Sequence, residues 1–185
     1  MPKKLKGKEW YALIAPEMFK GKVMGETPVG DPKTLIGRRI GIHLIKLIDD
    51  LSKYYMKFYF RVKNVKENKA YTEFDSLECL SDYISRLIRY GIKRIDIIQD
   101  LTTKDKVKIR VKTIIITRKK MKKSIEINLK EFIKNKIKKD VESSNLDELI
   151  EKIINDKLKN SLIKDGSKIY PIRTFEVRKI ERSSN

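Results

Sequence analysis

The residues that could carry out catalysis are few and isolated in this sequence. The only histidine, His43, lies in a stretch with strand-like alternation, and one histidine is too few for a histidine-built metal site. A Ser-His-Asp set stays open, but no serine lies in the Gly-x-Ser-x-Gly context of a nucleophile elbow. The single cysteine, Cys79, lies beside Leu80 in a predicted helix, which favours a structural thiol over a nucleophile. We therefore expect no catalytic residue and no enzyme activity.

Two other patterns come close to ligand sites without fitting them. The segment 25–34 (GETPVGDPKT) approaches a phosphate-binding loop, which requires Gly-x-x-x-x-Gly-Lys-Ser/Thr. Here Asp31-Pro32 separates Gly30 from Lys33, so an acid would face the phosphates, and a strand is predicted to follow. The adjacent acids Asp49-Asp50 are expected to face solvent at the end of a strand. We predict no metal site and no cofactor.

The basic residues form a more informative pattern. In segment 106–112, apolar residues alternate with four cations, so on a strand the cations share one face and recur about every 6.8 Å. This row leads into a second group of five cations between residues 118 and 123. Like charges at this density repel each other unless an anion lies among them. We therefore predict a loop that contacts phosphate, and a solvated, flexible loop is the alternative.

The charge of the whole chain points the same way. The 185 residues include 44 Lys and Arg against 25 Asp and Glu, which gives a net charge of +19. Such a charge repels itself in a compact body, and contacts with a polyanion remove this cost. Nucleic acid is the first candidate partner and an anionic membrane surface the second. Because the cations are spread along the chain, we favour a component of a folded RNA assembly over a reader of one short site.

The predicted RNA-binding residues are one aromatic residue and 22 cations. They are Lys3, Lys4, Lys6, Lys8, Trp10, Lys20, Lys22, Lys33, Arg38, Arg39, Lys106, Lys108, Arg110, Lys112, Arg118, Lys119, Lys120, Lys122, Lys123, Lys138, Lys139, Arg178 and Lys179. No apolar run is long enough to span a membrane, and a single cysteine fits a reducing compartment. We expect a cytoplasmic protein that does not enter a membrane.

The elements that must position these residues follow from hydrophobic periodicity. Residues 1–33 are expected to form an irregular basic arm, because Pro and Gly recur in it, with room for one short strand over 10–14. Residues 34–185 are expected to form a single domain. Strands are predicted over 34–47, 56–62, 70–74, 93–98, 106–117 and 172–180, and helices over 75–90, 128–141 and 146–163.

Two of the predicted helices begin with a capping-box pattern, Asp75 with Glu78 and Asn145 with Glu148. The short connections between strands favour an antiparallel sheet or a partly closed β-barrel. The predicted fold class is α+β, with one inserted helix and amphipathic helices near the C-terminus.

Several short motifs occur in one order along the chain. They are Lys8-Glu9-Trp10-Tyr11, Ala15-Pro16, Met18-Phe19, Gly37-Arg38, Asp96 to Thr103, Thr117 to Lys120, Ile137-Lys138-Lys139, Ser167 to Pro171 and Val177-Arg178-Lys179. With these motifs, the sequence resembles the small-subunit ribosomal protein family shared by archaea and eukaryotes, often called S-three-a-e or eukaryotic S-one. The resemblance extends over residues 8–182. The lysine-rich tails of eukaryotic members are missing, and the basic segment after Thr117 lacks their glutamine-rich character, so we expect an archaeal-type member.

This resemblance implies a structural, non-catalytic role on the platform of the small ribosomal subunit, near the messenger exit. The implied partners are small-subunit ribosomal RNA, neighbouring small-subunit ribosomal proteins and messenger RNA near the exit, in the cytoplasm. In that setting Trp10, Tyr11, Leu13, Ile14 and Phe19 would anchor the basic arm while its lysines meet phosphate. The alternatives are an RNA-acting enzyme and a generic basic nucleic-acid-binding protein outside the ribosome.

Overall fold

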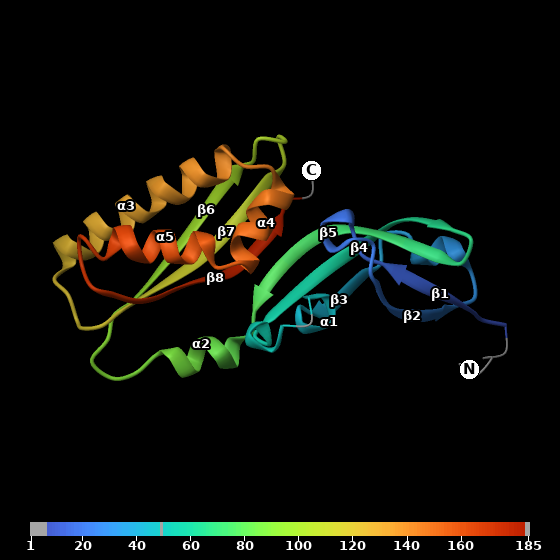
Figure 1. Ribbon diagram of the computed structural model, residues 1–185, viewed down its shortest axis with the longest axis horizontal. Helices are drawn as coiled ribbons and strands as arrows, with labels where there is room; N and C mark the ends of the chain where they lie inside the picture. Colours follow the sequence, from blue (N-terminus) through green and yellow to red (C-terminus); the bar gives the residue numbers. More distant parts are fainter. Residues whose placement is uncertain (1–6, 49, 184–185) are drawn as a thin grey trace. The chain divides into compact units, whose positions relative to one another are not determined.

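The chain contains two compact units, residues 1–77 and 78–185 (Figure 1). The structure is a computed structural model and describes residues 7–48 and 50–183. The boundary between the units falls within strand β5 (Lys69–Cys79), and each unit has its own strands and buried apolar side chains. The predicted division into an arm over 1–33 and a domain over 34–185 partitions the chain differently and stays a prediction.

The first unit is built mainly from strands. These are β1 (Glu9–Ile14), β2 (Val23–Val29), β3 (Arg39–His43), β4 (Met56–Lys66) and β5. Their order is β2-β1-β5-β4-β3, with β1 parallel to β5 and antiparallel to β2. A short helix, α1 (Ile45–Ile48), and 3₁₀ turns at Glu17–Phe19, Pro32–Leu35 and Leu51–Lys53 connect them.

The alternation predicted over 56–62 is confirmed by β4. Phe58 and Phe60 on one face are completely buried, while Arg61 on the other face is exposed. The predicted turn before β5 is also present: Glu67 and Asn68 both have positive φ, 46° and 59°, as a two-residue hairpin turn requires. Local pattern and turn chemistry therefore define this hairpin.

The short strand allowed over 10–14 is confirmed by β1, whereas the expectation that the rest of residues 1–33 is irregular is wrong for 23–29, where β2 pairs with β1. Pro28 lies in β2, an edge strand, where a missing N–H donor is tolerated. The connection between the strands is fixed by Phe19, whose ring packs edge-on against Phe58 and Phe60 at centroid distances of 5.5 and 5.8 Å. Tyr11 is buried too, so the predicted aromatic anchoring is present for these two residues.

The helix predicted over 75–90 is mostly wrong. Strand β5 continues to Cys79, and helix α2 covers only Ser81–Leu87. The burial of Phe74 and Ser76 continues the two-residue period of the strand. The carboxylate of Asp75 accepts hydrogen bonds from two arginines instead of capping a helix.

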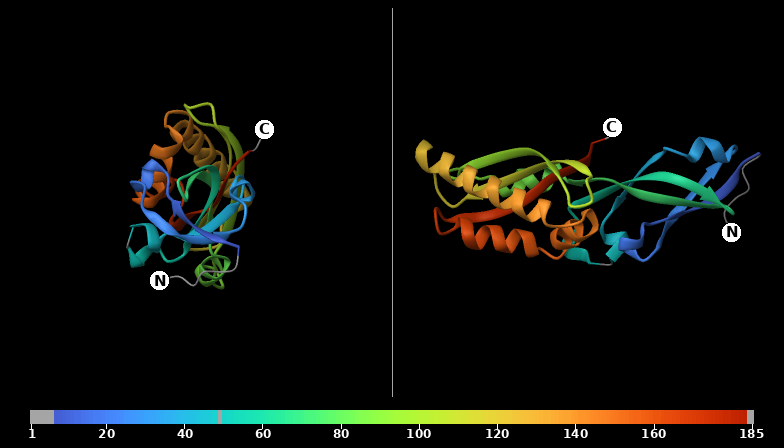
Figure 2. Two further views of the ribbon diagram at one scale, coloured as in Figure 1. Left: turned by 90° about the vertical axis from the view of Figure 1, so that its right-hand side faces the viewer. Right: turned by 90° about the horizontal axis from the view of Figure 1, so that it is seen from above.

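The second unit has three antiparallel strands in the order β6-β7-β8. They are β6 (Arg94–Thr102), β7 (Lys108–Thr117) and β8 (Ile172–Arg182). One face of this sheet is covered by α3 (Lys123–Glu142), α4 (Leu146–Ile154) and α5 (Lys157–Gly166) (Figures 1 and 2). The opposite face carries the polar side chains of the strands and is called the open face below.

The predicted C-terminal helix over 146–163 is two helices. Its start is confirmed, because Asn145 and Glu148 form a capping box and the Asn145 N–H donates to Glu148 Oε2 at 3.1 Å. The helix breaks before Asp156, which has a φ of 54°. Helix α3 begins earlier than expected and β6 ends later.

The α+β class is confirmed, with an open sheet in which most neighbouring strands are antiparallel. Within the part of the chain that the structure describes, no helix is both long enough and apolar enough to cross a membrane.

Candidate nucleic-acid interface

The cationic row predicted on residues 106–112 lies on the open face. Ile109 and Val111 are buried toward the helices, while Lys108 and Arg110 are exposed on the other side. Lys106 precedes β7 and lies in the turn, with a φ of 61°. The strand therefore separates apolar from basic side chains as the alternation predicted.

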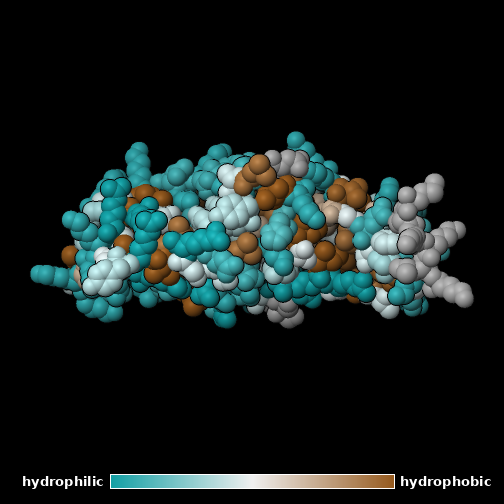
Figure 3. Space-filling model, turned by 90° about the horizontal axis from the view of Figure 1, so that it is seen from below, coloured by the Kyte–Doolittle hydropathy of each residue, from teal (hydrophilic) through white to brown (hydrophobic). Residues whose placement is uncertain are grey.

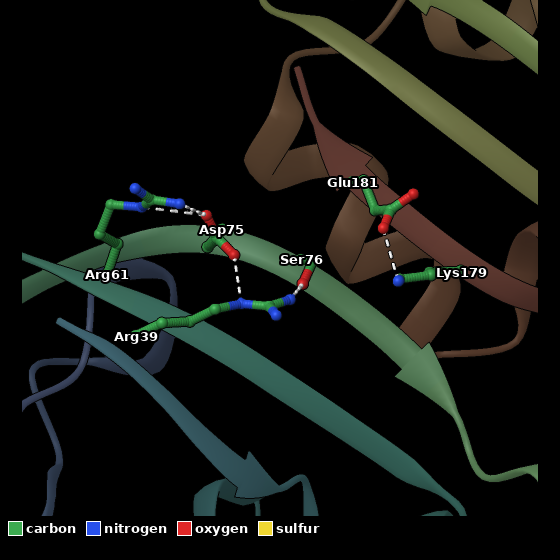
Figure 4. A network of polar contacts seen from close by, with 6 residues as sticks. All are labelled: Arg39, Arg61, Asp75, Ser76, Lys179 and Glu181. Atoms are coloured by element: carbon green, nitrogen blue, oxygen red, sulfur yellow. Dashed lines mark hydrogen bonds and ion pairs between the residues drawn. The ribbon is translucent and has the colours of Figure 1, made fainter. Parts of the chain in front are cut away.

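Part of this row is neutralised by the neighbouring strands. Arg110 forms a bidentate pair with Asp100 of β6, at 2.6 and 2.9 Å. Lys112 lies 3.0 Å from Glu181 of β8, and Lys179 contacts the same carboxylate (Figure 4). The pKa of Asp100 is lowered mainly by its hydrogen bond from Arg110, and the pKa of Glu181 mainly by its hydrogen bond from Lys179. Both carboxylates therefore stay ionised at neutral pH and offset the cations.

A second neutralised group lies in the first unit. Asp75 accepts hydrogen bonds from Arg39 Nε at 2.7 Å and from Arg61 Nη2 at 3.0 Å (Figure 4). The Arg39 guanidinium also lies over the Tyr59 ring, 4.0 Å from its centroid, and donates to the Ser76 hydroxyl. Arg39 is thus held on the strands by three partners. Fewer of its N–H groups are therefore available to a phosphate than predicted.

The densest group of unpaired cations is the basic loop, residues 118–122. Among the described residues, Arg118, Lys119 and Lys122 are exposed and have no ion-pair partner. The backbone of the loop is nevertheless fixed, because Lys120 O accepts a hydrogen bond from the Tyr170 hydroxyl at 2.9 Å and Lys119 O accepts one from the Thr117 hydroxyl at 2.7 Å. The loop therefore presents positive charge from a defined position.

Other predicted residues fall into three groups. Exposed cations without an ion pair inside the described ranges are Lys8, Lys20, Lys33, Lys106, Lys108, Lys139 and Arg178. A second group has partners inside the protein: Lys22 donates a hydrogen bond to Leu47 O and Arg38 donates one to the Thr27 hydroxyl. Lys123 forms an ion pair with Glu126, and Lys138 forms one with Glu142. Trp10 is half-buried. Lys3, Lys4 and Lys6 lie outside the described residues. For all the residues in these three groups, binding of RNA stays a prediction.

A groove of about 370 Å³ opens on the second unit between α2 and the open face. Four cations line it, Arg94, Lys112, Arg178 and Lys179, together with the half-exposed Ile98. Arg94 pairs with Asp96 at 2.8 Å, so Arg178 is the cation of this set without an ion pair among the described residues. The rest of the lining includes the apolar Ile84 and the acidic Glu78, so the groove is mainly but not wholly basic, and its cations suit a sugar-phosphate backbone.

The candidate chemical residues occupy structural positions. His43 is exposed on β3. Cys79 ends β5 instead of lying in a helix, and burial, with a contribution from Glu176, raises the pKa of its thiol to about 12. A thiol with this pKa stays protonated and is a poor nucleophile.

The two rejected ligand patterns also have structural roles. Asp31 accepts a hydrogen bond from the Lys33 N–H at 2.9 Å and caps the turn that follows, rather than facing a ligand. Asp50 accepts a hydrogen bond from the Ser52 N–H at 2.9 Å. The pKa of Asp50 is lowered mainly by the Ser52 side chain and, second, by this backbone hydrogen bond. Asp49 lies outside the described residues.

On the face that Figure 3 draws, hydrophilic side chains cover much of the surface, with apolar side chains visible between them.

Sequence reasoning missed Asp75, Asp100 and Glu181, the acids that remove several cations from the candidate set, and it missed Tyr90, an exposed aromatic residue near the basic loop.

Comparison with known proteins gives one consistent result. The model of the Ribosomal S3Ae family matches residues 2–184. Similar proteins from several organisms carry the name small ribosomal subunit protein eS1. The protein from Methanopyrus kandleri is 36% identical over 182 residues, which covers 96% of this chain and 86% of the relative. The one from Staphylothermus marinus is 37% identical over 176 residues (95% and 83%), and the one from Methanobrevibacter smithii 33% identical over 174 residues (94% and 90%).

Proposed function

Because this chain belongs to the Ribosomal S3Ae family, we propose that it is a structural constituent of the small ribosomal subunit and binds the RNA of that subunit. The observation that carries the proposal is the family match over nearly the whole chain. It is supported by relatives from archaea that are named as small ribosomal subunit proteins and cover about 95% of the chain. These names describe no enzyme, which agrees with the expectation that the chain is not one.

The distribution of charge supports RNA as the direct partner. The chain has a net charge of +19, and the basic loop, together with Arg178 in the groove beside α2, carries cations that no described acid neutralises. Such cations displace counterions from phosphates when they bind, which favours association with RNA. Cations that are already paired, such as Arg110, contribute less because a phosphate would have to compete with Asp100.

We extend the proposal, on the family resemblance, to the platform of the subunit near the messenger exit. Neighbouring small-subunit proteins and messenger RNA at the exit are then further partners, and the cytoplasm is the location. The unpaired cations lie on both units, which would allow each unit to contact RNA.

The test is the distribution of the native chain in density gradients of a cell lysate, detected with an antibody. We expect the chain in the small-subunit and whole-ribosome fractions, at one copy per small subunit. It should stay bound during a wash with moderate salt. A chain that stays in the soluble fraction at the top of the gradient, or that follows DNA or membranes, would refute the proposal. Treatment of the lysate with a ribonuclease is the control. It should release a chain that is bound to RNA, but not a chain that is bound to DNA or to membranes.

A further inference from the structure

Tyr90 is the most exposed large hydrophobic side chain in the described part of the molecule. It is 99% exposed, compared with 45% for Tyr54 and 42% for Tyr71. A single exposed aromatic residue is common on protein surfaces and needs no explanation by itself. Tyr90 differs because exposed basic side chains surround it.

The surroundings of Tyr90 are basic. The ammonium of Lys120 lies over its ring, 5.3 Å from the centroid. Arg86 and Arg89 on the same segment are exposed and, among the described residues, have no ion-pair partner. Lys120 belongs to the basic loop, so the ring lies beside the densest group of unpaired cations that the structure describes. An acidic protein segment could meet the charges, but the flat, solvent-exposed ring favours a stacking ligand.

The two segments are also fixed relative to each other. The Thr117 N–H donates to Lys93 O at 3.0 Å, and the Lys93 N–H donates to the Thr117 hydroxyl at 3.2 Å. Gly91, with a φ of 83°, turns the chain directly after Tyr90. Lys93 follows three residues after Tyr90, and Thr117 precedes the basic loop, so these hydrogen bonds keep ring and loop close. The backbone that carries the ring and the loop is therefore already ordered, so these two segments lose little freedom when a ligand binds between them.

We propose that Tyr90 and the basic loop form a binding site for an unpaired nucleotide of single-stranded RNA. The base stacks on the Tyr90 ring, and the adjacent phosphates lie against Lys120 and the exposed cations Arg118 and Lys119. Aromatic side chains beside a basic groove bind single strands in this way, because every base offers a π-face and every nucleotide a phosphate. Paired bases are stacked within a helix and do not reach the ring. This inference rests on the proposed function, since it specifies where and how RNA is bound.

The site makes a prediction that separates stacking from charge. The protein would be titrated into a labelled oligoadenylate of about eight nucleotides and into an RNA duplex of the same length. Tyr90→Leu should weaken binding of the single strand by about 5- to 150-fold, the range that loss of one stacked base gives. Tyr90→Phe should stay within about twofold of the native chain, because the ring is retained. Tyr71→Leu removes another exposed tyrosine in β5 and should change nothing.

Two further readouts make the result decisive. The salt dependence of binding should be the same for Tyr90→Leu and the native chain, because stacking releases no counterion. The melting temperatures should agree as well, since the Tyr90 side chain is almost entirely in solvent. Unchanged affinity of Tyr90→Leu for the single strand, or equal losses for Tyr90→Leu and Tyr90→Phe, would overturn the site. If the site failed this test but the native chain still bound the single strand in a salt-dependent manner, the proposed RNA binding would stand without the Tyr90 site. A native chain that bound neither the single strand nor the duplex would overturn both the site and the proposed function.

Discussion

The difference between paired and unpaired cations can be tested with two variants that change the net charge equally. The first replaces Arg118, Lys119 and Lys122 of the basic loop with glutamine. The second replaces Arg110, Lys112 and Lys179, which share the carboxylates of Asp100 and Glu181. Each variant removes three positive charges, so a protein that binds RNA only through its total charge would respond to both in the same way.

The expected size follows from the contacts. If each loop cation meets one phosphate, the slope of log K against log salt should fall by about 0.7 to 0.9 per cation, or roughly 2 to 3 for the loop variant. At low salt the affinity should drop roughly 100-fold, since each contact is worth about 1 kcal/mol. The second variant should change the slope by less than about 1, because those cations are offset by acids in the protein.

The assay is fluorescence anisotropy with a small-subunit RNA fragment at several salt concentrations. Urea unfolding of both variants is the control: the loop variant should keep the native stability, because its side chains are exposed and the described structure shows no ion pair for them. Equal slopes for the two variants would contradict the reasoning, since only net charge would then matter. An unchanged slope for the loop variant would show that the basic loop does not contact phosphate.

Three further predictions concern stability. Glu176→Gln leaves the Lys159 ammonium, 2.6 Å from Glu176 Oε1, without its counter-charge, and should lower the free energy of unfolding in urea by about 3 kcal/mol; a loss under about 1 kcal/mol would contradict this. The Cys79 thiol has its pKa raised from 9.0 to about 12, so the native state keeps its proton longer than the unfolded state. Stability should therefore fall as pH rises from about 9 toward 12, and Cys79→Ala should lose this part of the pH dependence; identical curves would refute it. Gly166→Ala places a methyl 2.5 Å from Ile172 Cδ1 and should lower the melting temperature, at a net cost of about 1 kcal/mol; an unchanged or higher value would show that the core yields.

The elements that the sequence predicted well are those in which the local pattern agrees with the tertiary environment. Strand β4 alternates cleanly and buries one face completely, and α4 begins at the predicted capping box. In these cases the residues that specify the element are neighbours in the sequence. Periodicity and capping chemistry are then sufficient to predict the element from the sequence.

The elements that were predicted wrongly depend on partners far away in the sequence. Segment 75–79 has the spacing of a helix start, but Arg39, 36 residues earlier, binds the Asp75 carboxylate and the segment continues as a strand. The pairing of β1 with β2 overcomes the prolines and glycines of the first 33 residues because β2 is an edge strand. Such tertiary contacts override local preference.

The candidate interface was predictable to a similar extent. The alternation of cations and apolar residues on β7 placed the basic row on one face, which the structure confirms. The pair Arg110–Asp100 could also have been deduced, because a turn between residues 102 and 108 sets these two opposite each other in the hairpin. The role of Glu181 could not, since it requires the register of β8 against β7, two strands that three helices separate in the chain. Nor does the sequence tell that Tyr90 is almost fully exposed beside Lys120.

The central claim, that this chain is an RNA-binding component of the small ribosomal subunit, is tested most directly by binding to small-subunit RNA fragments. The affinity of the native chain would be measured over a range of salt, with duplex DNA as competitor. We expect a steep salt dependence that reports several released counterions, and a preference for one RNA fragment that duplex DNA does not remove. Equal affinity for all fragments and for duplex DNA would contradict the account, because it would leave a generic polyanion binder.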